Sequence, residues 1–171
     1  MFVDEVRIYV KGGDGGDGAV SFRREKFVPR GGPNGGDGGN GGNVIIRANK
    51  NIDTLLDITS KVKFIAEDGG QGQNRNKNGK DGRDLIINVP KGTLIKDLKT
   101  GRTIKDLKEN DVSITIARGG RRGRGNAYFK SPTDQTPRFA EDGRNGHERW
   151  LRLELKLIAD IGIIGLPNAG K

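Results

Sequence analysis

Apolar residues in this chain fall into short runs separated by long polar stretches, and such runs are typical of β-strands. They predict strands over residues 2–10, 19–27, 43–48, 62–66, 85–89 and 114–117. The sequence IKDLK occurs twice, at residues 95–99 and 104–108, on either side of a turn that contains Gly101, and residues 94–107 are predicted to form a β-hairpin. No window before residue 148 shows a sustained helical period. The predicted fold class is therefore mainly β, in the form of a small barrel or sandwich.

The pattern changes close to residue 148. Residues 150–157, WLRLELKL, alternate apolar and polar positions, which predicts a strand with one exposed face. Residues 158–164 are nearly all apolar, which is typical of a buried parallel strand in an α/β domain. We therefore predict one domain over residues 1–157 and the beginning of a second over residues 158–171. Trp150 is interpreted as a core or domain-junction residue.

Between the predicted strands, glycines recur at every third position. This spacing occurs in six places, within residues 12–18, 32–42, 69–72, 79–82, 120–123 and 143–146. A polyproline II helix has three residues per turn, so such glycines form one bare edge along which another backbone can lie. We predict six mutually packed polyproline II segments that leave one end of the β-structure, and expect Gly38→Val to damage the domain as a core substitution would.

Two other interpretations of the glycines are weaker. Flexible linkers are the first alternative, because glycine-rich chains without apolar residues usually behave as coils. The period is kept in six separate places, each beside a predicted strand, and this favours packed segments. A collagen triple helix is disfavoured because the runs are short and the chain has only 6 prolines.

Composition narrows the class of protein. Of the 171 residues, 32% are hydrophobic and 29 are glycine, so the apolar core must be small. No run is long enough to span a membrane, and the N-terminus lacks the features of a signal peptide. We expect a soluble, cytoplasmic monomer. The absence of cysteine and the single histidine, His147, disfavour a metal site.

The formal net charge is +9, and the basic residues form three clusters that we interpret as loops. The clusters are Arg23, Arg24, Lys26 and Arg30, then Arg75, Lys77, Lys80 and Arg83, and finally Arg118, Arg121, Arg122, Arg124 and Lys130. Three basic loops favour a phosphate-rich partner, namely nucleic acid, over loops whose charge serves only solubility. Tyr128 and Phe129 in the third cluster are candidates for stacking on bases.

Two further sets of residues are weaker candidates for a functional site. Asp14, Asp17 and Asp37 alternate with glycines, but they lack the spacing of a calcium loop and are predicted to face solvent. His147 has no evident nucleophile or orienting partner, so a surface position is predicted rather than a role as general base.

The last seven residues carry a phosphate-binding motif. Directly after the apolar run, Gly165, Leu166, Pro167, Asn168, Ala169, Gly170 and Lys171 fit G-x-x-x-x-G-K. The glycines allow backbone N–H groups to surround phosphate oxygens, and the lysine adds a cation. The Ser or Thr that would follow and hold Mg²⁺ is not among the 171 residues, so no metal site is predicted within them.

Several motifs together resemble the N-terminal half of the Obg family of GTPases. They are FRREKFVPRGGPNGGDGGNGG at 22–42, KDGRD at 80–84, VPKGT at 89–93, GNAYF at 125–129 and LELKLIADIGIIGLPNAGK at 153–171. The resemblance implies six left-handed polyproline-type helices on a β-structure, followed by a GTPase domain that uses GTP, GDP and Mg²⁺. Asn34, Arg122 and His147 depart from the residues common in the family. Asn168 matches an Asn that can help hold K⁺ in related GTPases, and the alternative for this residue is a turn-forming role.

The resemblance also implies a function. Members act in assembly of the large ribosomal subunit and in stress responses, and the glycine-rich loops are implied to contact ribosomal RNA near the peptidyl-transferase region. The intact protein is expected to hydrolyse GTP, whereas these 171 residues alone are not. The alternative is a structural or protein–protein interaction module without RNA binding, which salt-dependent RNA affinity would distinguish.

Overall fold

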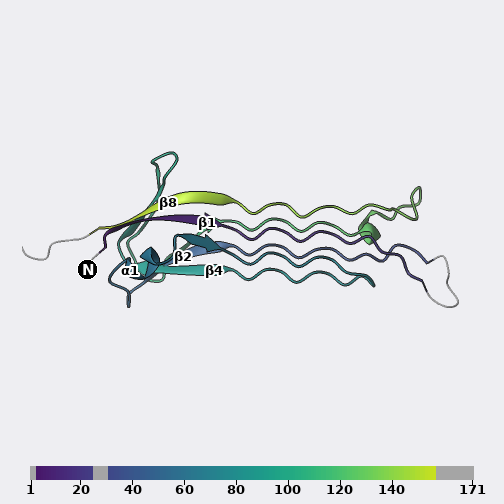
Figure 1. Ribbon diagram of the computed structural model, residues 1–171, viewed down its shortest axis with the longest axis horizontal. Helices are drawn as coiled ribbons and strands as arrows, with labels where there is room; N and C mark the ends of the chain where they lie inside the picture. Colours follow the sequence, from purple (N-terminus) through teal and green to yellow (C-terminus); the bar gives the residue numbers. More distant parts are fainter. Residues whose placement is uncertain (1–2, 25–30, 157–171) are drawn as a thin grey trace, which may run out of the picture.

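The computed structural model describes residues 3–24 and 31–156. Figure 1 shows an elongated molecule with β-sheet structure at one end and glycine-rich segments that run side by side to the other. There are two sheets and, among the described residues, six such segments. We call the sheets the base and the six segments together the shaft. The predicted excursion of glycine-rich segments from one end of a β-structure is confirmed.

The base contains two sheets. The larger has the order β3 (Lys63–Ile65), β1 (Glu5–Lys11), β8 (Glu148–Leu155), β5 (Thr93–Asp97) and β6 (Thr103–Leu107). The smaller has the order β4 (Leu85–Pro90), β2 (Val44–Asn49) and β7 (Ser113–Ala117). Each sheet contains one strand that pairs in parallel with one neighbour and antiparallel with the other: β1 with β3 and β8, and β2 with β4 and β7. The remaining pairs, β8 with β5 and β5 with β6, are antiparallel.

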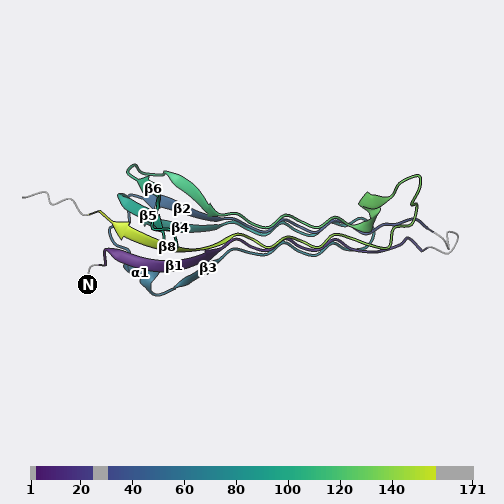
Figure 2. The same ribbon diagram turned by 90° about the horizontal axis from the view of Figure 1, so that it is seen from above.

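The alternation of apolar residues along the strands builds the core between the sheets. In β1, Val6, Ile8 and Val10 point inward, whereas the residues between them are exposed or half-buried. They belong to one buried cluster with Val44 and Ile46 of β2, which lies in the other sheet. The two sheets are separate layers, so the base is a sandwich and not a closed barrel, as Figure 2 also shows.

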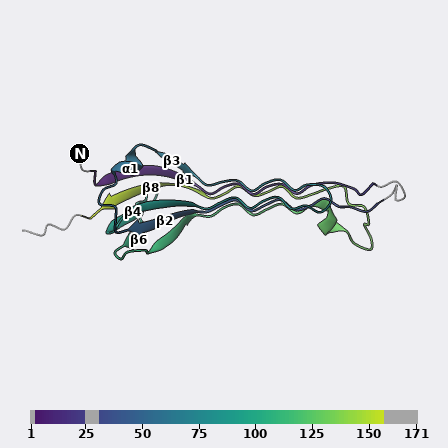
Figure 3. The ribbon, with the colours of Figure 1, turned by 90° about the horizontal axis from the view of Figure 1, so that it is seen from below.

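Most predicted strands are present, and the hairpin of β5 and β6 has Gly101 in its turn at φ +69°. The strand predicted over 19–27 is wrong for its described residues, because 19–24 make only one isolated bridge, between Phe22 and Pro33. This stretch is the extended end of a shaft segment. Two short helices were not predicted, α1 (Leu56–Thr59) and η1 (Asn126–Phe129), since four residues are too few to establish a period. Figure 3 shows α1 beside β1 and β3.

The prediction that Trp150 is a core residue is wrong. Its side chain is 46% exposed on β8 and packs against Tyr9, with ring centroids 5.3 Å apart. The Tyr9 hydroxyl donates a hydrogen bond to Glu148, which raises the pKa of Tyr9. A domain-junction role for Trp150 stays a prediction.

Each shaft segment continues one strand of the base. In chain order the first to sixth segments are residues 12–19 after β1, 34–43 before β2, 66–73 after β3, 77–84 before β4, 118–125 after β7 and 141–147 before β8. The segments therefore form three hairpins, whose far ends we call the tips. Segments that continue paired strands are themselves neighbours, so strand pairing in the base sets the order of the shaft.

Backbone hydrogen bonds join the segments with a three-residue repeat. In the first segment, the N–H groups of Gly13 and Gly16 donate to the second segment at 2.9 and 2.8 Å. The N–H groups of Gly12 and Gly15 donate to the sixth segment, both at 2.9 Å. Similar bonds join the second segment to the third and fifth. The six segments therefore form one hydrogen-bonded bundle without an apolar core of its own.

The number of glycines per repeat follows the number of close neighbours. A Cβ on Gly38 would lie 1.9 Å from the carbonyl oxygen of Gly16 in the first segment. A Cβ on Gly39 would lie 1.9 Å from the carbonyl oxygen of Lys80 in the fourth segment. The second segment has close neighbours on two sides, so each three-residue repeat needs two glycines. The outer fourth segment needs only one, such as Gly79.

The residues between the glycines are not merely solvent-facing, as was predicted for three aspartates. Asp14, Asp17 and Asp37 accept hydrogen bonds from the backbone N–H groups of Gly146, Gly143 and Gly125, at 2.8, 2.8 and 2.9 Å. Asp17 is exposed, as predicted, whereas Asp14 and Asp37 are half-buried. The prediction is incomplete because all three carboxylates also satisfy N–H groups of neighbouring segments. The Lys11 ammonium, 2.7 Å from Asp14, and the Gly146 N–H hold the pKa of Asp14 below its ordinary value.

Candidate nucleic-acid interface

The three hairpin tips meet at the end of the shaft that is remote from the base. They comprise the described residues of 20–33, the turn at 73–77 and the loop at 126–140. Because both segments of every hairpin belong to the same bundle, the three tips are held side by side although they are far apart in sequence. Any site at this end is therefore built from three separate parts of the chain.

Asn126 fastens two of the tips to each other. Its side chain is fully buried, and its Oδ1 atom accepts hydrogen bonds from the N–H groups of Gly35 and Ser21 at 2.9 and 3.3 Å. Its Nδ2 atom donates to the carbonyls of Ser21 and Pro137, both at 3.1 Å. Every hydrogen-bonding position of this buried amide has a role in holding the tips.

The middle tip is a tight turn that presents a basic side chain. Arg75 and Asn76 have positive φ angles of 58° and 55°, and the Gln73 N–H donates to the Lys77 carbonyl at 2.9 Å. The Asn76 N–H donates to the Asn34 carbonyl at 2.7 Å, which ties this turn to the start of the second segment, next to the first tip. Left-handed backbone is costly for a residue such as arginine, so these contacts fix a turn that would otherwise relax.

The third tip carries an aromatic cluster. The Phe129 ring lies between Tyr128 and Phe139, at centroid distances of 5.4 and 4.7 Å. The Arg124 guanidinium lies over the Tyr128 ring at 4.0 Å. Tyr128 and Phe139 are 57% and 54% exposed, whereas Phe129 is half-buried between them. Stacking of bases on Tyr128 or Phe129 stays a prediction, and Phe139 offers the more open ring of the two phenylalanines.

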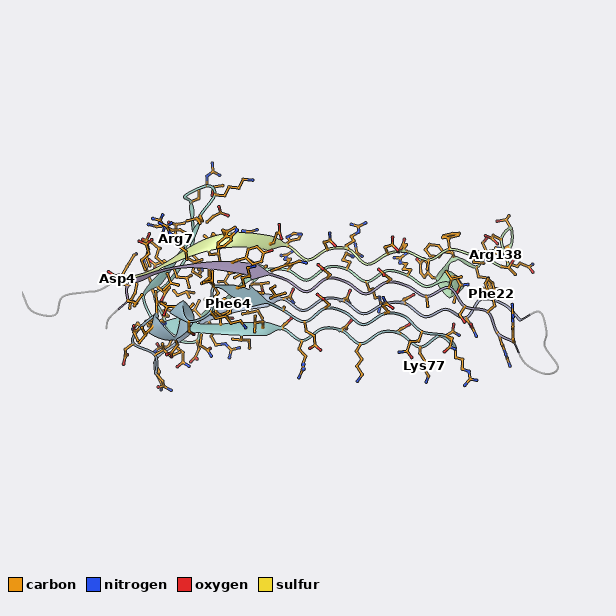
Figure 4. The ribbon with its side chains drawn as sticks, in the orientation of Figure 1. Asp4, Arg7, Phe22, Phe64, Lys77 and Arg138 are labelled. Atoms are coloured by element: carbon orange, nitrogen blue, oxygen red, sulfur yellow. The ribbon has the colours of Figure 1, made fainter. Side chains whose placement is uncertain are left out.

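Two hollows open around Phe22. One, of about 500 Å³, is lined by residues of the first and third tips that include Val20, Thr136 and Arg138. The other, of about 460 Å³, is lined by residues of the first and second tips that include Asn34 and Arg75. Phe22, Arg23 and Arg24 line both hollows. Figure 4 shows Phe22 and Arg138 at this end of the molecule and Lys77 on the edge of the shaft nearby.

The structure divides the predicted basic residues into two groups. Arg23, Arg24, Arg75, Lys77 and Lys130 lie at the tips, and Lys80, Arg83, Arg118, Arg121, Arg122 and Arg124 lie along the shaft. The interpretation of all three clusters as loops is therefore wrong for the shaft residues, because a three-residue repeat with an outward third position looks like a basic loop in sequence. Lys26, Arg30 and the predicted phosphate-binding loop at 165–171 lie outside the described residues.

Ion pairs compensate part of the charge on the shaft. On the shaft, Arg83 lies 2.8 Å from Glu67 and lowers the pKa of that carboxyl, and Arg122 lies 3.7 Å from Asp37. At the tips, Arg24, Arg75 and Arg138 make no ion pair with any residue in 3–24 or 31–156. Lys80, Arg118 and Arg121 on the shaft also make no ion pair within the described residues, so what distinguishes the tips is that three unpaired arginines come together there from three separate hairpins.

Comparison with known proteins agrees with the resemblance noted above. Residues 3–157 match the family described as GTP1/OBG. The chain belongs to this family.

Similar relatives include three proteins named GTPase Obg. The identity is 58% over 171 residues with that of Sulfurihydrogenibium sp. (strain YO3AOP1), covering 100% of this chain and 49% of the relative. It is 57% over 171 residues with that of Moorella thermoacetica, covering 100% and 40%. It is 56% over 170 residues with that of Persephonella marina, covering 99% and 50%. The chain therefore spans about half the length of these relatives or less.

One basic residue at the tips, Arg138, was not predicted from the sequence. Arg138 precedes the sixth segment and is followed by the exposed Phe139, yet it lies outside the basic clusters. A basic residue beside an aromatic one, just before a glycine repeat, is the signal that could have identified it. Elsewhere, no group of three acidic or histidine side chains in the described residues could hold a metal ion. No helix in the same part of the chain is long and apolar enough to cross a membrane.

Proposed function

We propose that this chain is the RNA-contacting part of a GTP-binding protein that acts on the large ribosomal subunit. The observation that carries the proposal is the convergence of Arg24, Arg75 and Arg138 from three hairpin tips at one end of a long bundle. Uncompensated arginines on a narrow end are suited to phosphate groups inside a structured RNA, where a flat basic surface would not reach. We infer contact with ribosomal RNA near the peptidyl-transferase region, in subunit assembly and in stress responses.

The shaft acts in this proposal as a rigid spacer. We infer that its six segments are left-handed polyproline-type helices, which the three-residue hydrogen-bond repeat supports. At about 3.1 Å per residue, the ten residues 34–43 would hold the tips roughly 30 Å from the base. A hydrogen-bonded bundle of this length places the tip arginines without the entropy cost of ordering free loops.

Nucleotide chemistry belongs to the other end of the chain. We place the domain boundary near residue 157, and residues 165–171 would surround the phosphates of GTP or GDP with backbone N–H groups and Lys171. Mg²⁺ would require the Ser or Thr position that follows the motif, and Asn168 is the candidate for contact with K⁺. We propose GTP hydrolysis for the intact protein in the cytoplasm and none for residues 1–171 alone.

Co-sedimentation with purified large ribosomal subunits across a salt series tests the RNA proposal. The tip variant carries Arg24→Gln, Arg75→Gln, Lys77→Gln and Arg138→Gln. The matched control carries Lys91→Gln, Lys99→Gln, Arg102→Gln and Lys105→Gln, four exposed residues of the base.

We expect salt-sensitive binding by the unmodified chain and by the control. The tip variant should reduce the slope of log affinity against log salt by roughly 3, since each lost phosphate contact removes about 0.7–0.9. Equal effects of the two variants would contradict placement of the interface at the tips. Absence of salt-sensitive binding by the unmodified chain would favour a structural or protein-interaction module instead.

A further inference from the structure

The two hollows at the tips share a wall that contains Phe22 together with Arg23 and Arg24. The half-buried ring stands between a hollow on the side of the third tip and another on the side of the second. Each hollow has a volume, about 500 and 460 Å³, that is typical of small-molecule sites. An aromatic ring between two such spaces can present a face or edge to a planar ligand on either side.

The hollow on the side of the third tip combines apolar and cationic groups. Val20, which is 48% exposed, and Phe22 supply apolar surface, and Thr136 supplies a hydroxyl. Arg24 and Arg138 are exposed at the same hollow and have no ion-pair partner in the described part of the chain. The arrangement suits a ligand with a flat, weakly polar body and a negatively charged end.

The hollow on the side of the second tip is more polar. Asn34, Asn74 and Asn76 contribute amide groups, and Arg24 and Arg75 contribute guanidinium groups. The Oδ1 atom of Asn34 is buried without a hydrogen-bond partner among the described residues. Buried acceptors normally have a donor, so a turn of this side chain toward the hollow would let its amide oxygen accept from an N–H group of a ligand there.

These features together select one class of ligand. We propose that unpaired nucleotides of RNA bind on both sides of Phe22, with their bases in the two hollows and their phosphates at Arg24, Arg75 and Arg138. Bases of an A-form duplex are stacked on each other and their edges are difficult to reach, whereas splayed bases can enter hollows and stack on aromatic rings. The inference rests on the proposed RNA-binding function and narrows it from RNA in general to single-stranded segments.

Fluorescence anisotropy with two probes tests this inference on the 171-residue chain. The probes are a short labelled single-stranded RNA of mixed sequence and the blunt duplex formed by the same strand with its complement, at equal salt. We expect the single strand to bind about tenfold more tightly than the duplex, because only its bases can reach the hollows. Equal or tighter binding of the duplex would overturn the inference.

Variants of the shared wall sharpen the test. Phe22→Leu keeps the apolar contact and removes the aromatic face, and it should abolish most of the single-strand preference. Arg138→Gln, at an exposed position, should weaken binding of the single strand by several-fold without affecting the fold. Trp150→Ala removes an aromatic residue of the base that is 46% exposed and should change neither affinity. An unchanged single-strand preference in Phe22→Leu would refute the role of Phe22, provided that its thermal unfolding matches the unmodified chain.

The two proposals can fail separately. If the chain shows salt-sensitive binding to large subunits that depends on the tip arginines, but prefers duplex RNA, only the nucleotide hollows are refuted. If the chain binds neither subunits nor either RNA probe, the proposed function is refuted and this inference with it.

Discussion

The base and the shaft reach a packed state in opposite ways. In the base, Ile8, Ile46 and Leu153 are fully buried and the interior is made of side chains. In the shaft, the interior is made of backbone, and a Cβ on Gly38 would lie 1.9 Å from a neighbouring carbonyl oxygen. The difference shows that a region with hardly any apolar side chains can still have an interior. The base should be sensitive to the removal of atoms, and the shaft to their addition.

The largest expected effect comes from adding atoms to the shaft. Gly38→Val would force the first and second segments apart and break hydrogen bonds along both, so we expect a loss of more than about 5 kcal/mol in the free energy of unfolding. Thermal and urea unfolding measure it. Gly32→Ala is the control, at the end of the first tip just before the second segment. A Cβ at this position would meet only the Lys130 Nζ atom, at 3.8 Å. Similar stability of the two variants would mean that the shaft is not packed on its backbone.

Removing atoms from the base should have the next largest effect. Ile46→Ala leaves a cavity between the sheets, and we expect a loss of about 2–5 kcal/mol in urea unfolding. Ile86→Ala, at a position that is 41% exposed on the neighbouring strand, should cost less than about 1 kcal/mol. Equal losses would indicate that the two sheets do not pack as described.

Substitution of Asn126 tests the junction between shaft and tips. Here the segments are joined by the hydrogen bonds of a side chain and not only by backbone hydrogen bonds. Asn126→Ala would leave the Gly35 and Ser21 N–H groups and the Pro137 carbonyl without their partner. We expect a loss of about 1–3 kcal/mol and faster proteolysis within the tips, because buried polar groups are costly to leave unpaired. Exposed Asn145, changed to Ala, is the control. A variant as stable and as protease-resistant as the control would contradict the fastening role.

The smallest expected effect concerns pH at the junction of base and shaft. Lys11 and the Gly146 N–H hold the pKa of Asp14 below its ordinary value of 3.8. A carboxyl with a lowered pKa in the folded state stabilises the fold fully above its unfolded value and loses this contribution as the pH falls through the folded value. Asp14→Asn keeps an oxygen acceptor for Gly146 but cannot titrate. The melting temperature of this variant should therefore fall less between about pH 5 and about pH 2 than that of the unmodified chain. Parallel pH profiles of the two melting temperatures would contradict this.

The sequence predicted the base and the shaft unequally well. Alternating apolar residues such as Val6, Ile8 and Val10 located the strands, and the glycine spacing located the six segments. The run over 19–27 was mistaken for a strand because an extended segment end and a β-strand share the same composition. The two glycine registers that contain Gly38 and Gly39 indicated that this segment has close neighbours on two sides. Which segments those neighbours are depends on the strand order of the base, which the local sequence pattern does not encode.

The candidate site was predicted in part. Arg24 and Arg75 were identified from basic clusters, although nothing in the sequence indicated that they line one hollow with Phe22. Lys80 and Arg118 were assigned to loops because an outward third position in a repeat and a loop residue look alike. Arg138 was missed since it is separated from other basic residues along the chain and joins them only through the bundle. The role of Asn126 was not predicted, although the residue lies in the motif GNAYF. Its four hydrogen bonds join it to residues that are distant along the chain.

Amide hydrogen exchange, followed residue by residue by NMR, tests most directly whether the glycine segments form a packed bundle that holds the tips. In the first segment, the N–H groups of Gly15, Gly16 and Gly18 are hydrogen-bonded to neighbouring segments, whereas that of Asp17 donates to no group in the described residues. We expect the three glycines to exchange as slowly as β1 amides and Asp17 to exchange much faster. Uniformly fast exchange throughout residues 12–19 would show that these glycines behave as a flexible linker, and would contradict the account.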